Sequence, residues 1–102
     1  MIAMHMKWEG ISLEQYDEVR NIVQWETNQP KGGLFHTAFH DGKALRVVDV
    51  WETAQDFNNF VEQRLMPGVL STGITSQPTV EVYPVHALFT PGYVPKKNLA
   101  VA

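Results

Sequence analysis

The sequence predicts a small α+β fold, in which two helices pack on one face of a four-stranded antiparallel sheet. Three features predict it: a hairpin signal at Asp41-Gly42, two amphipathic segments that each begin at a capping residue, and alternating apolar residues at the start of the chain. A chain of 102 residues suits one domain with a modest core. We expect that domain over residues 1–89, followed by an extended C-terminal tail at 90–102.

The first third of the chain predicts a strand and a helix. Apolar residues alternate with small or polar ones from Ile2 to Trp8, which is the period-two pattern of a strand. Ser12 and Gln15 then form a capping-box signature, and apolar residues recur after it at helical spacing. These signals predict a helix over 13–26.

Two more strands, Leu34–His40 and Lys43–Trp51, are predicted on either side of Asp41-Gly42. This dipeptide favours a two-residue type I′ turn, because both turn positions need a positive φ. If these two residues are the whole turn, His36 lies opposite Val47.

The rest of the chain predicts one helix and one strand. Thr53 is the N-cap of an amphipathic segment that we expect to end at Pro67-Gly68. The last strand, Thr79–Leu88, contains Pro84, which has no N–H for a central ladder and therefore predicts an edge strand. With right-handed crossovers, the order strand, helix, strand, strand, helix, strand is that of a ferredoxin-like fold.

The hairpin divides its side chains between two faces. One set is nearly all apolar: Phe35, Thr37, Phe39, Ala44, Arg46, Val48 and Val50. The other set mixes large apolar residues with histidine and acid: Leu34, His36, Ala38, His40, Lys43, Leu45, Val47, Asp49 and Trp51.

The second set predicts a partner. Two helices cover only one side of a sheet, and we expect them to cover the nearly all-apolar set. Leu34, Val47 and Trp51 would then face water, and an apolar patch of that size is typical of an interface. We therefore expect a homodimer through this sheet face, with a space between the two sheets.

His36, Asp49 and Trp51 are the candidate site residues. His36 is the predicted general base, Asp49 fixes the tautomer of its imidazole, and Trp51 stacks on the ring of a phenol or enol substrate. Three further residues are expected to line the substrate-binding space: Leu34, Val47 and His86.

Each candidate also has a structural interpretation. His36 suits a hydrogen-bonded strand histidine, Asp49 its acceptor, and Trp51 a core residue. A non-haem metal ion held by two histidines and one acid is a further alternative, but the sequence does not identify the third ligand beside His36 and Asp49. We expect neither a metal nor another cofactor.

Composition excludes several classes of function. The net charge is −3 and no basic stripe is present, which argues against nucleic-acid binding. Cysteine is absent, so the chain has no disulfide framework and no thiol nucleophile. No stretch of about 18 apolar residues and no signal-peptide pattern is present, which predicts a cytoplasmic protein without membrane contact.

The sequence resembles the dimeric α/β-barrel superfamily, and within it the antibiotic-biosynthesis-monooxygenase-like domains, in a branch of unassigned function. The resemblance covers roughly residues 1–89. It is found at Trp8-Glu9-Gly10, Glu14-Gln15-Tyr16-Asp17, His36, Val48-Asp49-Val50-Trp51-Glu52, Phe57, Phe60, Arg64-Leu65 and Val82-Tyr83-Pro84-Val85-His86.

The resemblance implies a dimeric ferredoxin-like barrel and several activities. The superfamily includes cofactor-free quinone-forming monooxygenases, haem-degrading monooxygenases and isomerases. The haem degraders have a cavity-lining tryptophan at the position of Trp51 and a haem-ligating histidine on the second helix, and that helix has no histidine here. We expect a cofactor-independent monooxygenase-like enzyme acting on a small aromatic or polyketide-like substrate. The alternative is a non-catalytic dimeric barrel that binds a small hydrophobic molecule.

Overall fold

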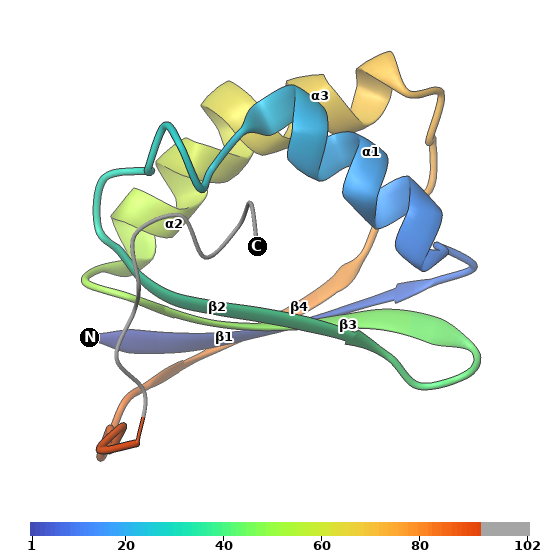
Figure 1. Cartoon of the computed structure of the whole chain (residues 1–102). Helices are drawn as coiled ribbons and strands as arrows, with labels where there is room; N and C mark the ends of the chain where they lie inside the picture. The colour runs from blue at the N-terminus through green and yellow to red at the C-terminus, as the bar shows by residue number, and fades with distance from the viewer. Residues whose placement is uncertain (93–102) are drawn as a thin grey trace.

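Four antiparallel strands form one sheet in the order β2-β3-β1-β4, and the helices cover one of its faces (Figure 1). This computed structural model describes residues 1–92. The predicted tail at 90–102 therefore lies outside the described residues, except for residues 90–92. The elements are β1 (Ile2–Glu9), α1 (Leu13–Val23), β2 (Gly33–His40), β3 (Ala44–Trp51), α2 (Ala54–Phe60), the π-helical turn η1 (Val61–Leu65), α3 (Met66–Ser71) and β4 (Thr79–Pro84). The predicted βαββαβ fold class is confirmed.

The edge position of the last strand is also confirmed. Among residues 1–92, β4 pairs only with β1, and Pro84 is its last residue. The strand ends there and not at Leu88 as predicted, because proline cannot donate a ladder hydrogen bond.

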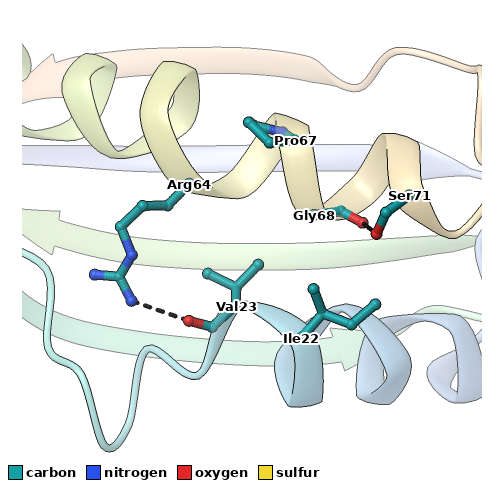
Figure 2. Close-up of a pocket in the computed structure, with 6 residues that line it drawn as sticks. All are labelled: Ile22, Val23, Arg64, Pro67, Gly68 and Ser71. Carbon is teal, nitrogen blue, oxygen red and sulfur yellow. Dashed lines mark hydrogen bonds between the residues drawn. The ribbon is translucent and has the colours of Figure 1, made fainter.

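Helix α1 begins as predicted and ends three residues early. The Ser12 capping box is formed in full, with the Ser12 side chain accepting from the Gln15 N–H. Gln24 then adopts the left-handed conformation, which ends the helix after Val23. The Arg64 guanidinium donates to the Val23 carbonyl oxygen at 3.0 Å and so satisfies an acceptor that the helix end leaves free (Figure 2). It also donates to the carbonyl oxygen of Asn28, in the loop after α1, at 2.7 Å.

The second helical segment does not end at Pro67-Gly68, so that prediction is wrong. The chain continues through η1 and α3 to Ser71. The π turn changes the hydrogen-bond spacing just before the proline, and Pro67 then lies in the first turn of α3, where a missing N–H is tolerated. The longer segment lies beside α1, and a surface groove separates the two (Figure 2).

Gly68 lets α3 approach α1 closely. A Cβ at this position would lie 2.6 Å from Cγ2 of Val23, a buried and stiff β-branched side chain. Gly68→Ala should therefore lower the free energy of unfolding by roughly 1 kcal/mol, because the clash outweighs the gain in helix propensity. Urea unfolding measures this, and Gly92→Ala is the control because its added Cβ meets nothing within 4 Å. An unchanged or higher midpoint for Gly68→Ala would contradict the expectation.

The register of the hairpin is shifted by two residues from the prediction. His40 pairs with Leu45 and not with Lys43, so residues 41–43 join the two strands and His36 lies directly opposite Asp49. The Asp41 carboxylate accepts from the backbone N–H groups of Ala44 and Lys43 and pairs with Arg46, and these donors hold its pKa well below the usual range. A register shift of two residues preserves the side-chain faces, since the strand period is two.

The helices cover the opposite face from the one predicted. The core beneath them contains Val47 and Trp51 of β3, together with Met4 and Met6 of β1, which are register partners of Asp49 and Val47. The prediction that the set with Phe35 and Val48 is helix-covered is therefore wrong. The error arose because the hairpin was considered without β1, and the His36 face of the hairpin then looked too polar for a core.

The same finding corrects the predicted interface. Val47 and Trp51 are buried within one chain, so they cannot form a surface for a second copy. The open face of the sheet instead presents Phe35, Phe39 and Tyr83, all partly exposed.

Candidate functional site

His36 and Asp49 meet across the β2–β3 ladder on the helix-covered face. Nδ1 of His36 lies 2.7 Å from Oδ1 of Asp49. Asp49 is buried, with 6% of its surface exposed, whereas one third of the His36 side chain (33%) is exposed at the edge of the sheet. The two predicted site residues are therefore hydrogen-bonded to each other, and their roles as base and orienter stay a prediction.

Trp51 completes the surroundings of the acid. Its indole Nε1 donates to Oδ2 of Asp49 at 3.0 Å, so each carboxylate oxygen has a partner. The ring is 3% exposed and packs against Phe57 and Phe60, with ring centroids 5.7 and 5.4 Å apart. The prediction that His36, Asp49 and Trp51 share one face is confirmed, but that face is under the helices and not between two sheets.

Tyr16 is the site residue that sequence analysis missed. It projects from α1, and its phenolic oxygen lies 2.6 Å from Nε2 of His36. Its position within the apolar stripe of α1 suggested only core packing. The hydroxyl was the available signal, because a half-buried tyrosine O–H usually has a hydrogen-bond partner.

These residues form one hydrogen-bonded chain, Tyr16–His36–Asp49–Trp51, which we call the relay. Burial raises the pKa of Tyr16 to about 12, so at neutral pH the phenol is protonated and donates to Nε2. His36 must then carry its own proton on Nδ1 and donate it to Asp49. Every donor in the chain points toward the buried carboxylate.

Aromatic rings and an ion pair surround the outer end of the relay. Trp25 meets His36 edge-on at 5.4 Å and Tyr16 at 5.7 Å, measured between ring centroids. Arg20, one turn after Tyr16, forms an ion pair with Glu26, and this hydrogen bond lowers the pKa of Glu26. The accessible edge of the His36 imidazole therefore lies beside the flat rings of Trp25 and Tyr16 and near the paired Glu26 carboxylate.

The other predicted lining residues are not brought to the relay. Val47 is a core residue opposite Ala38, and Leu34 lies at a strand irregularity with 46% of its surface exposed. His86 is exposed beyond the end of β4, and β1 and β3 lie between β4 and β2. Within residues 1–92, no group of three metal-ligating side chains could hold an ion.

A separate apolar cavity of about 240 Å³ lies between the sheet and the second helical segment, over β1 and β4. None of the relay residues lines it. Phe57 connects the two regions, because its ring lines the cavity and also packs on Trp51. The cavity is lined by Met6, Trp8, Phe57, Asn58, Val61, Leu65, Met66, Gln77, Pro78 and Val80.

Comparison with known proteins gives similarity in structure only. No family model matches the sequence, and no curated protein is significantly similar to it. A Nitrosomonas europaea protein of unknown function, NE2512, has a TM-score of 0.68 at 15% identity, over 90% of this chain and 95% of that one. SnoaB, a cofactor-independent oxygenase from Streptomyces nogalater, has a TM-score of 0.60 at 12% identity, over 90% and 96% of the two chains. A protein described as an antibiotic biosynthesis monooxygenase has a TM-score of 0.60 at 15% identity, over 85% of this chain and 100% of that one.

The chain has the antibiotic-biosynthesis-monooxygenase-like fold. The resemblance found in the sequence is thereby confirmed for the architecture. Proteins with this fold include both a named oxygenase and a protein of unknown function, so the fold does not assign a reaction. Within residues 1–92, no helix combines the length and the apolar character needed to span a membrane.

Proposed function

We propose that this protein is a cofactor-independent, monooxygenase-like enzyme that removes a proton from a small phenol or enol. The observation that supports it is the relay, in which a buried carboxylate orients an imidazole that is itself accessible at the edge of the site. A neutral imidazole held in this way is oriented to act as a general base.

The chemistry needs a base and an electron-rich substrate. When His36 takes up a proton, the negative Asp49 stabilises the imidazolium, and the hydrogen bond from Trp51 keeps the carboxylate in place. The deprotonated phenol or enol becomes electron-rich and can donate an electron to O₂. SnoaB, described as a cofactor-independent oxygenase, has a similar fold, which supports the proposal.

Oxygen uptake tests the proposal. The purified protein is supplied with hydroquinones and anthrone-like phenols, without added metal or flavin, beside a metal-chelated sample. Uptake that depends on both protein and substrate is the expected result. The absence of uptake on every substrate would contradict the proposal.

A second candidate function is the binding of a small hydrophobic molecule without turnover. The separate apolar cavity favours it, because about 240 Å³ lined by methionine, aromatic and aliphatic side chains suits a compact apolar ligand. The relay favours it too, since each nitrogen of His36 already has a protein partner. Calorimetric binding of apolar aromatics without oxygen uptake would support this function over the first.

We also propose a homodimer through the open face of the sheet. Phe35 and Phe39 are 37% and 48% exposed there, beside Val48, and a sheet face open to water normally carries more polar residues. The charged residues on the same face are already paired, since Arg46 contacts Asp41 and His5, and His5 contacts Glu81. Because these charges are already paired, burying them in a dimer interface costs less free energy.

Phe35→Asp should convert the dimer into a monomer, because it places an unpaired charge in this interface. Sedimentation velocity at micromolar concentration measures the change. Leu70→Asp is the matched control, since Leu70 is 59% exposed on α3, away from the open face. A monomeric unmodified protein would contradict the proposed dimer. So would dissociation caused by Leu70→Asp and not by Phe35→Asp.

A further inference from the structure

We propose that Tyr16, and not His36, is the residue that contacts the acidic hydroxyl of the substrate, and that Tyr16 passes its own phenolic proton to His36. This inference rests on the proposed proton abstraction and names the group that performs its first step. It also narrows the substrate to a planar molecule with a hydroxyl group on an aromatic ring.

The first reason is that His36 has no free nitrogen. Nδ1 is held by Asp49 at 2.7 Å and Nε2 by the phenol of Tyr16 at 2.6 Å. A substrate hydroxyl can reach Nε2 directly only if Tyr16 leaves. Helix α1 opposes that movement, because the Tyr16 N–H bonds to the Ser12 carbonyl and the capping box fixes this first turn.

The second reason is that Tyr16 still has a free acceptor. A phenolic oxygen has one proton to donate and lone pairs to accept with, and the proton is already given to Nε2. The oxygen can therefore accept a hydrogen bond from a substrate hydroxyl while its bond to His36 stays intact. The ring of Trp25, 5.7 Å from that of Tyr16, offers an apolar surface to a planar substrate.

The step is balanced in atoms and charge. The substrate O–H bond breaks and a new O–H bond forms at Tyr16 Oη, while the original Tyr16 O–H bond breaks and a new N–H bond forms at His36 Nε2. The electron pair remains on the substrate oxygen as a phenolate, and the positive charge on the imidazolium is stabilised by Asp49. Because the pKa of Tyr16 is raised to about 12, a free tyrosinate is disfavoured and the two transfers occur together.

A coloured phenol tests the relay independently of oxygen chemistry. 4-Nitrophenol is added to the protein at a pH where the free dye is mostly protonated, and its visible absorption reports whether the bound dye is ionised. We expect ionised dye on the unmodified protein and loss of the phenolate band with Tyr16→Phe and with His36→Ala. Tyr83→Phe is the matched control, since the Tyr83 hydroxyl also donates a hydrogen bond to a side chain, here Glu81, but lies on the open face. This variant should ionise the dye normally.

Two results would overturn the inference: a phenolate band that persists with Tyr16→Phe, or no binding of ionised dye by the unmodified protein. Far-UV circular dichroism and the thermal midpoint show whether Tyr16→Phe keeps the fold, and the substitution retains the ring that packs beside Trp25 and His36. Dye ionisation that depends on Tyr16, together with no oxygen uptake on any substrate, would leave the relay standing and reject the oxygenase proposal.

Discussion

His36→Ala should reduce kcat by about 10²–10⁴-fold in the oxygen-uptake assay, which is the usual cost of removing a positioned general base. The side chain is one third exposed and lies at a sheet edge, so the thermal midpoint should change little. Steady-state kinetics beside a thermal melt therefore separate loss of chemistry from loss of fold. Asp49→Asn should have a smaller kinetic effect, because it weakens the preferred tautomer without removing the base.

His86→Ala is the matched control for this prediction. It also removes one histidine, but this residue is exposed beyond β4 and does not meet the relay. Turnover should stay at the level of the unmodified protein. Turnover that survives His36→Ala, or that is lost with His86→Ala, would place the base elsewhere.

Trp51→Ala should lower the free energy of unfolding by about 3–5 kcal/mol, as expected for truncating a fully buried aromatic side chain. The indole is 3% exposed, packs on Phe57 and Phe60, and donates to the buried Asp49 carboxylate. A small domain has a total stability of only about 5–15 kcal/mol, so a large part of it would be lost. Urea unfolding followed by circular dichroism measures the change.

Trp51→Phe separates the packing of this residue from its hydrogen bond. Phenylalanine keeps most of the contact with Phe57 but removes the N–H donor to Asp49. Its loss of stability should be smaller than that of Trp51→Ala, because only the hydrogen bond and part of the ring contact are lost. A Trp51→Ala variant as stable as the unmodified protein would show that the indole does not support the core.

The sequence was sufficient to predict the element order and the shared face of His36, Asp49 and Trp51. Both follow from local rules, namely capping residues, strand alternation and a turn dipeptide. The register proved to be shifted by two residues, because the Asp41 carboxylate accepts hydrogen bonds from the backbone N–H groups of Lys43 and Ala44, and an even shift leaves the faces unchanged. The shared face was therefore robust to an error in the turn.

Local sequence patterns did not determine which face of the sheet the helices cover. The hairpin has two largely apolar faces, and only its pairing with β1 distinguishes them: Met4 and Met6 lie beside Asp49 and Val47, while His5 and Lys7 lie beside Val48 and Arg46 on the open side. Tyr16 was missed for the same reason. Its contact with His36 depends on how α1 crosses the sheet. The spacing of apolar residues within α1 does not reveal that crossing.

The position of β2 at the edge of the sheet has a consequence for how the relay responds to ligands. Within the described part of the chain, β2 is hydrogen-bonded to a single neighbour, β3, so its amides belong to the part of the sheet that can open locally without global unfolding. His36 therefore lies on one of the less protected strands, while Asp49 and Trp51 lie on a strand paired on both sides. A molecule bound beside Tyr16 and Trp25 and in contact with the relay would bind only the closed form and would shift the local equilibrium toward it, so occupancy of the site and ordering of the sheet edge are thermodynamically linked.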